Sequence, residues 1–189
     1  MIKQISMLTY GVLLLMALSF DRSWAITHDT TNDRQCRSAS SQNPRSGTPD
    51  QWVELGQRVH GGFGSYIALG IRIGLDAMQR LDAEPRDLDV TYYNGVTAPC
   101  PCVVDGIMIA TVSTPGQNLL RVAVTPSPEG TFGVAEIRAR TTGKMLRYTI
   151  PATAKRQLDT WNQNTTGRQR YDAVMNVSER TLFSVETIR

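Results

Sequence analysis

The feature that most constrains the fold is a helical repeat of apolar residues that carries two glycines. Between Tyr66 and Leu81 the apolar residues recur at the spacing of one helix face, which predicts a buried helix. Gly70 and Gly74 lie one turn apart on the neighbouring face. Because each glycine destabilises a helix interior by about 1 kcal/mol relative to alanine, we expect another backbone to pack closely against the helix at these two positions.

The segments around this helix predict an α+β fold. Apolar alternation predicts strands at residues 87–93, 119–124, 131–140, 145–150 and 181–188. Helical spacing predicts further helices near residues 51–60, 102–111, 152–161 and 168–177. Asp50 is expected to cap the first of these helices, and Pro151 to open the third. Since helices and strands do not alternate regularly, we expect a central, mostly antiparallel sheet, with the buried glycine-containing helix and other helices flanking it.

The N-terminal segment predicts export. Lys3 supplies a positive start, an uncharged run extends to Phe20, and Ser23-Trp24-Ala25 matches the small-x-Ala pattern of a cleavage site. We therefore expect a signal peptide over 1–25 and a periplasmic or secreted protein that has no stable membrane insertion after cleavage. A retained N-terminal anchor stays open, because the uncharged run approaches the length that spans a bilayer.

The next segment, residues 26–50, is rich in polar residues and predicts a disordered linker, which leaves a domain at 51–189. The net charge is +3 and the basic residues are scattered rather than clustered. A nucleic-acid-binding surface needs a basic stripe, so we expect no nucleic-acid partner.

The three cysteines of the chain allow several pairings. Their odd number leaves at least one thiol unpaired in an oxidising compartment, and they are too few for an iron–sulfur cluster. A Cys100–Cys102 bridge closes a tight ring around Pro101, and we expect it to be strained. A bridge from Cys36 to either of them, or a free or metal-bound thiolate, are the alternatives.

Two stretches carry residues that suit a binding site. The first is His60 with Gly61, Gly62 and Gly64, which directly precede the buried helix. Glycines let a backbone approach a ligand closely, and their amides beside a helix N-terminus can form an anion-binding nest. A tight turn required by packing is the alternative interpretation.

The second stretch begins at Cys102, where a helix is expected to start. The helix dipole favours a thiolate at that position, and Asp105 follows in the first turn. Imidazole, thiolate and carboxylate together form the ligand set of a divalent transition metal, zinc first. Taken alone, Cys102 also suits a small core residue, and Asp105 an ordinary helix-start acid.

Together the two stretches resemble the FmdE-like family, which takes its name from formylmethanofuran dehydrogenase. The resemblance extends from about Trp52 to Arg189 and rests on the order and spacing of short motifs. These motifs are His60-Gly61, Gly64-x-Tyr66, Leu69-Gly70-x-Arg72-x-Gly74, Cys102-x-x-Asp105-Gly106-Ile107, Ala110-Thr111 and Thr114-Pro115-Gly116. The resemblance implies an α+β fold, a homodimer, and a metal ion held by His and Cys side chains.

The resemblance assigns the metal to His60, Cys102 and Asp105, with Cys100 offering a second sulfur. The ligand-binding candidates are Gly61, Gly62, Gly64, Tyr66, Arg72 and Ser113. Arg72 either faces the pocket as an anion anchor or lies on the solvent side of its helix. Two positions depart from the family pattern, because Gly62 replaces a histidine and Ser113 replaces a cysteine, and this weakens the case for tight zinc binding.

Three functions remain in competition. The leading hypothesis is an exported FmdE-like domain that binds zinc, another divalent transition metal or a small ligand in a His/Cys pocket. It predicts that the His60 loop and the Cys102 helix start lie within about 4–8 Å of each other. The alternatives are a Cys-dependent enzyme, with Cys102 as the reactive thiolate and His60 as its proton partner, and a degenerate scaffold that dimerises or binds a partner protein.

Overall fold

The computed structural model describes residues 47–188. The expected signal peptide at 1–25, most of the expected linker and Cys36 lie outside this range. The first helix of the described range, α2 (Pro49–His60), begins just before the expected domain start at residue 51. None of the helices within the described range is both long and apolar enough to cross a bilayer.

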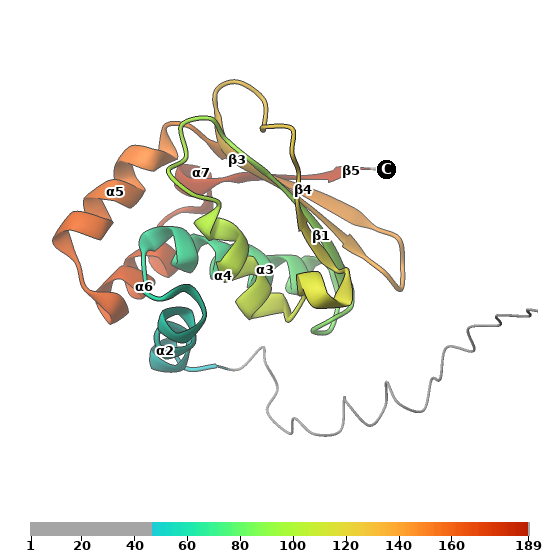
Figure 1. Ribbon diagram of the computed structural model, residues 1–189, viewed down its shortest axis with the longest axis horizontal. Helices are drawn as coiled ribbons and strands as arrows, with labels where there is room; N and C mark the ends of the chain where they lie inside the picture. Colours follow the sequence, from blue (N-terminus) through green and yellow to red (C-terminus); the bar gives the residue numbers. More distant parts are fainter. Residues whose placement is uncertain (1–46, 189) are drawn as a thin grey trace, which may run out of the picture. The chain divides into compact units, whose positions relative to one another are not determined.

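A five-stranded sheet forms one layer of residues 47–188 (Figure 1). Its order is β2-β1-β3-β4-β5. The strands are β1 (Leu88–Asn94), β2 (Leu120–Val122), β3 (Thr131–Ala139), β4 (Met145–Pro151) and β5 (Ser184–Ile188). Only the β1–β2 pair is parallel among these strands, and the other three pairs are antiparallel. The predicted α+β class with a mostly antiparallel sheet is confirmed.

Helices gather on one side of this sheet (Figure 1). They are α3 (Ser65–Leu81), α4 (Cys102–Thr111), the short 3-10 helix η2 (Pro115–Gln117), α5 (Ala154–Asn164), α6 (Gly167–Asn176) and α7 (Glu179–Leu182). Helix α4 connects the parallel strands β1 and β2, as such a pair requires. Leu88, Val90 and Tyr92 of β1 are fully buried, at alternate positions of the strand.

Helix α3 is the buried centre of the helical layer, and α4 packs directly across it at the glycines. A β-carbon added at Gly70 would collide with the carbonyl oxygen of Val103, and one added at Gly74 would lie 2.8 Å from the β-carbon of Ala110. Gly106 makes the reciprocal contact from α4, since a β-carbon there would collide with the carbonyl oxygen of Ile67. The predicted close approach of a second backbone is confirmed.

Two local expectations about helix starts are wrong. Thr48, not Asp50, caps α2: its side chain accepts from the amide of Gln51, and the Gln51 side chain accepts from the amide of Thr48. This reciprocal capping box satisfies two otherwise unpaired donors. Pro151 ends β4 instead of opening α5, which begins only at Ala154.

Candidate functional site

The centre of the candidate site is a contact between His60 and Asp105. His60 is the last residue of α2, which ends because Gly61 adopts a left-handed conformation with φ of 85° and donates its amide to the carbonyl of Gln57. Asp105 lies in the first turn of α4. His60 Nδ1 and Asp105 Oδ2 are 2.7 Å apart, and the two side chains remain 30% and 36% exposed. The pair is therefore open to solvent and to ligands.

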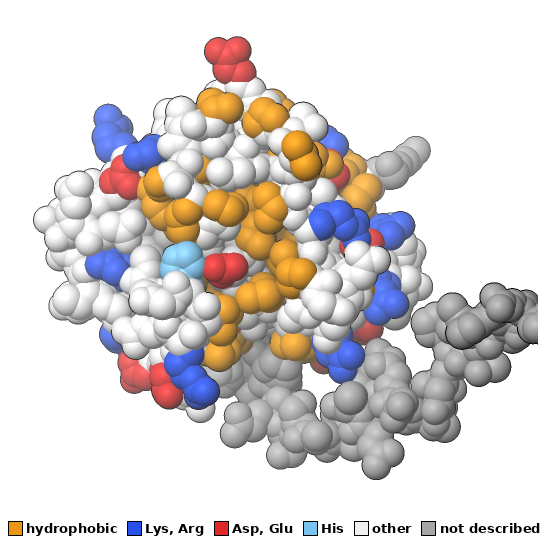
Figure 2. Space-filling view, viewed as in Figure 1, with side chains coloured by type: hydrophobic (Ala, Val, Ile, Leu, Met, Phe, Trp, Pro, Cys, Tyr) orange, Lys and Arg blue, Asp and Glu red, His pale blue; other side chains and the backbone are white. Residues whose placement is uncertain are grey.

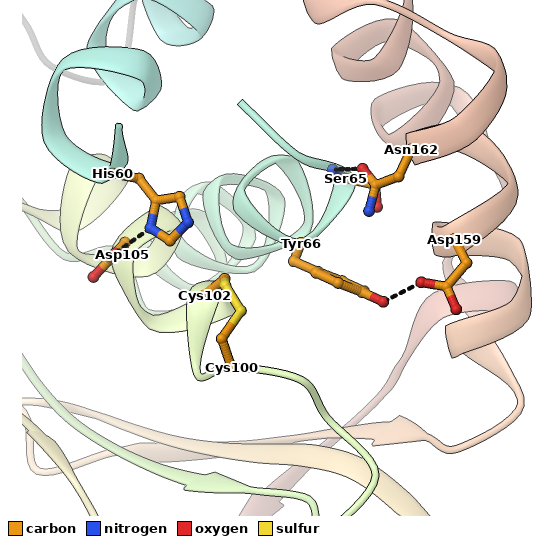
Figure 3. Close-up of a disulfide and its surroundings, with 8 residues drawn as sticks. All are labelled: His60, Ser65, Tyr66, Cys100, Cys102, Asp105, Asp159 and Asn162. Carbon is orange, nitrogen blue, oxygen red and sulfur yellow. Dashed lines mark hydrogen bonds and ion pairs between the residues drawn. A yellow bond between two sulfur atoms is a disulfide. The ribbon is translucent and has the colours of Figure 1, made fainter. Parts of the chain in front are cut away.

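The contact also fixes which ring nitrogen of His60 is available. An ionised carboxylate can only accept a hydrogen bond, so Nδ1 must donate to Asp105. In the neutral imidazole this leaves Nε2 as the nitrogen with a free lone pair. Figure 3 shows the ring edge opposite Asp105 turned towards the side on which Cys102 and Tyr66 lie.

Cys102 belongs to the same face of α4 as Asp105. The two residues are three positions apart in one helix, which places their β-carbons about 5–6 Å from each other. Gly106 packs closely against the backbone of α3, and this holds the backbone of this turn of α4 in place. The structure thus brings the His60 segment and the Cys102 helix start together (Figure 3).

Apolar side chains surround the His60–Asp105 pair on this face of the domain. Figure 2 shows a histidine beside a carboxylate, with apolar side chains around the pair. The histidine in this view is His60, the sole histidine in the range 47–188. A ligand seated here would meet one polar pair in largely apolar surroundings.

Cys102 is joined to Cys100 by a disulfide. Of the pairings that the sequence leaves open, this is the one formed, and the two Cα atoms are 5.3 Å apart, within the usual range of about 4.4–6.8 Å. Cys102 is 8% exposed, while Cys100 is half-buried. In this form neither sulfur is a thiolate.

The donor set of the disulfide form does not fit a zinc ion. No group of three or more His, Cys, Asp or Glu side chains placed to hold a metal occurs between residues 47 and 188. Zinc requires four ligands, or three with an open position for water. With both sulfurs bonded to each other, only His60 and Asp105 remain as donors.

Tyr66 faces helix α5 instead of offering its hydroxyl to a ligand. The hydroxyl donates to Asp159, which also accepts from Lys155 Nζ at 2.6 Å, and the ring stacks on Phe132 with centroids 5.1 Å apart. Burial raises the pKa of Tyr66, and the neighbouring carboxylate raises it further. The phenol therefore stays protonated and joins α3 to α5 as a hydrogen-bond donor.

Several amides at the start of α3 already have partners within the fold. The amide of Ser65 donates to Oδ1 of Asn162 at 2.7 Å, so a side chain of α5 already satisfies it (Figure 3). The amides of Ile67 and Ala68 donate to the carbonyl of Gly64. A β-carbon at Gly62 would meet nothing within 4 Å, and unlike Gly61 this residue does not have a positive φ.

Arg72 and Ser113 lie away from the His60–Asp105 pair. Arg72 donates to the carbonyls of Val174 and Val177 at 2.6 and 2.8 Å, so it anchors the end of α6 and is not an anion anchor. Ser113 follows α4 and donates to the carbonyl of Leu88 at 2.9 Å. With a rise of about 1.5 Å per residue, the length of α4 separates Ser113 from Cys102 by about 15 Å. Ser113 and Cys102 therefore cannot bind the same ion.

Sequence reasoning missed the contribution of α5. Lys155, Asp159 and Asn162 hold Tyr66 and Ser65 in place, although about 90 positions separate the partners. The i,i+4 spacing of Lys155 and Asp159 is visible in the sequence, but it indicates only a helix-surface ion pair. No local motif marks these residues as supports of the site.

The comparison with known families fits this arrangement of elements. The family model described as FmdE, molybdenum formylmethanofuran dehydrogenase operon, matches residues 59–184, which is more than half of the chain. The chain belongs to the FmdE family. The match begins next to His60 and includes Cys102 and Asp105, and the FmdE family is associated in general with metal binding. No curated protein matches the chain.

Proposed function

We propose that this FmdE-family domain binds a divalent transition metal ion, zinc first, and does so only when Cys100 and Cys102 are reduced. The observation that carries the proposal is the 2.7 Å contact between His60 and Asp105 at an exposed edge, with Cys102 in the same helical turn as Asp105. These residues come from two elements that meet only in the folded chain.

Reduction would change the donor set at this place. It would free two sulfurs from one short loop, beside an imidazole whose Nε2 is not used by Asp105. Two thiolates and an imidazole, with water in the fourth position, match an open zinc site. Asp105 would then orient His60, because carboxylates behind metal-binding imidazoles fix the tautomer and the ring direction.

The test measures binding of Co²⁺ and Zn²⁺ to the full chain before and after reduction with a phosphine, without oxygen. We expect binding to the reduced chain, with the charge-transfer absorption of cobalt–thiolate bonds, and weak binding to the oxidised chain. His60→Ala should weaken binding at least about 10–100-fold, the loss typical even for an outer partner of a ligand. His28→Ala, which removes the other histidine of the chain, is the matched control. If neither the reduced nor the oxidised chain binds Co²⁺ or Zn²⁺, the proposal is contradicted and a scaffold without metal is favoured.

We also propose that the chain is exported and forms a homodimer. The Cys100–Cys102 disulfide supports export, because disulfides persist in oxidising compartments. The mass of the protein recovered from its native host tests cleavage after Ala25, and light scattering tests the dimer. A full-length mass in the cytoplasm would contradict the first proposal, and a monomer mass the second.

A further inference from the structure

The two sulfurs of the disulfide differ in how a molecule from solvent can reach them. Cys100 is half-buried and lies between Pro99 and Pro101, which are both exposed. Cys102 is 8% exposed, and it is the first residue of α4, which packs on α3. A thiol that approaches from solvent therefore meets the sulfur of Cys100 first, with Cys102 behind it as the leaving sulfur.

The backbone around the disulfide is built to hold both sulfurs near each other after the bond breaks. Cys102 is fixed because the adjacent turns of α4 pack against Ile67 and Gly70. Pro101 has a ring-fixed φ, which restricts the only residue between the cysteines. Since the Cα atoms are already 5.3 Å apart, the bond can open and close again without a rearrangement of the fold.

A group that can transfer a proton is held at the same turn of α4 as the leaving sulfur, because Asp105 binds His60. Asp105, one helical turn from Cys102, holds Nδ1 of His60, so Nε2 is free to accept and return a proton. The negative charge that develops on the departing Cys102 sulfur also lies at the N-terminus of α4, where the helix dipole stabilises it. A disulfide that serves only as a structural link needs neither feature.

From this arrangement we infer that Cys100–Cys102 is a thiol–disulfide exchange site for small thiols, with Cys100 as the sulfur attacked and Cys102 as the sulfur released. This activity goes beyond metal binding and requires no metal. It gives the imidazole–carboxylate pair a role in the oxidised chain, in which the donor set does not fit zinc.

The reaction balances with two molecules of a small thiol as the only co-reactant. The proton of the first thiol passes to Nε2 of His60, and its thiolate attacks Sγ of Cys100. The disulfide bond breaks, Cys102 leaves with the electron pair and takes the proton from His60, and a mixed disulfide remains on Cys100. A second thiol then attacks the outer sulfur of the mixed disulfide and transfers its proton to Cys100. Two small thiols are thereby oxidised to one disulfide, and the protein disulfide is reduced to two thiols.

The experiment follows reduction of the oxidised full chain by glutathione in the presence of a chelator. Cys36→Ser is included in every variant, so that a mixed disulfide can form only at Cys100 or Cys102. Rapid alkylation traps the intermediate, and tandem mass spectrometry locates the glutathione. We expect glutathione on Cys100 with the alkyl group on Cys102, and reduction of the native chain at least as fast as that of the same chain in denaturant.

His60→Gln provides the second readout. It should slow reduction about tenfold, less than the roughly 10²–10⁴-fold typical of proton-transfer catalysis, because a thiolate is already a good leaving group. His28→Gln is the matched control and should leave the rate unchanged. Glutathione found on Cys102, an unchanged rate in His60→Gln, or slower reduction of the native chain than of the denatured chain would each overturn the inference. Because the chelator removes metal from this assay, its failure is distinct from a failure of the reduced chain to bind cobalt or zinc.

Discussion

His60 Nδ1 lies 2.7 Å from Asp105 Oδ2, which joins the last residue of α2 to the first turn of α4 across 45 positions of the chain. This contact sets the tautomer of the imidazole and holds its free nitrogen on the side of the cysteine pair (Figure 3). The same contact would serve both proposed activities, metal binding in the dithiol form and thiol exchange in the disulfide form. Both activities depend on the close packing of α4 against α3.

Gly106→Ala should destabilise the domain. The added methyl group would collide with the carbonyl oxygen of Ile67, and a backbone atom cannot move aside as a flexible side chain can. Overpacking of this kind costs about 1–3 kcal/mol, and we expect it to exceed the gain of about 1 kcal/mol that alanine brings to a helix. Thermal unfolding followed by circular dichroism should show a Tm lowered by several degrees, at about 2–4 °C per kcal/mol for a domain of this size.

Gly62→Ala is the matched control for this substitution. A β-carbon at Gly62 meets nothing within 4 Å, and its φ is not positive. Its Tm should be unchanged or slightly raised, because alanine restricts the unfolded chain more than glycine does. Equal Tm values for Gly106→Ala and Gly62→Ala would show that the close approach of α3 and α4 does not require a glycine at position 106.

The sequence predicts the helices and strands well but predicts the site only in part. The spacing of Gly70 and Gly74 indicates a second backbone, and the packing of α4 confirms it, because only close helix packing favours glycine at such positions. The disulfide was not predictable, since the pairing of three cysteines depends on distances that the sequence does not contain. The hydrogen bond from the Ser65 amide to Asn162 was not predictable either, because it is a tertiary contact between α3 and α5.

Arg72→Met should lower stability without affecting the metal affinity of the reduced chain. The substitution keeps apolar volume beside the Phe183 ring, which lies 5.5 Å from the guanidinium, but leaves the carbonyls of Val174 and Val177 without their donor. Each unsatisfied group costs about 1–3 kcal/mol. Denaturant unfolding should show the loss, with the exposed Arg156→Met as control. Weaker metal binding at unchanged stability would instead assign Arg72 to the site.

Asp159→Asn should reduce the sensitivity of the domain to acid. Burial opposes ionisation of Asp159, but hydrogen bonds from Lys155 and Tyr66 outweigh it and hold the pKa below its usual value. A carboxylate with a depressed pKa stabilises the fold above its unfolded value of about 3.9, and this contribution is lost as the pH falls through the folded value. The variant should therefore melt lower at neutral pH but lose less Tm than the wild type between about pH 5 and pH 2.5. Glu129→Gln is the control, and parallel Tm–pH curves for Asp159→Asn and wild type would contradict the prediction.

Gly62→His should strengthen metal binding by the reduced chain. Gly62 occupies the position where the family resemblance expects a second histidine, and nothing within 4 Å obstructs a side chain there. An added imidazole would supply a further nitrogen donor near His60. We expect a Kd for Co²⁺ at least about tenfold lower, since even the loss of a residue that only supports a ligand typically changes metal affinity by about 10–100-fold. Gly62→Leu, with a side chain of similar reach and no donor, should bind as the wild type does. An unchanged Kd in Gly62→His would place the ion elsewhere.

Ser113→Cys should fail to strengthen metal binding, although the resemblance expects a cysteine there as well. Ser113 is fully buried beyond the C-terminal end of α4, and its hydroxyl is used by the carbonyl of Leu88. The rise of a ten-residue helix, about 15 Å, exceeds any metal–ligand distance, so a sulfur at this position cannot reach an ion held beside Cys102. Cobalt titration of the reduced variant should give the wild-type Kd, with unfolding by denaturant measured in parallel because a thiol is a weaker hydrogen-bond donor than a hydroxyl. Tighter cobalt binding in Ser113→Cys would show that the ion lies near the far end of α4, away from His60.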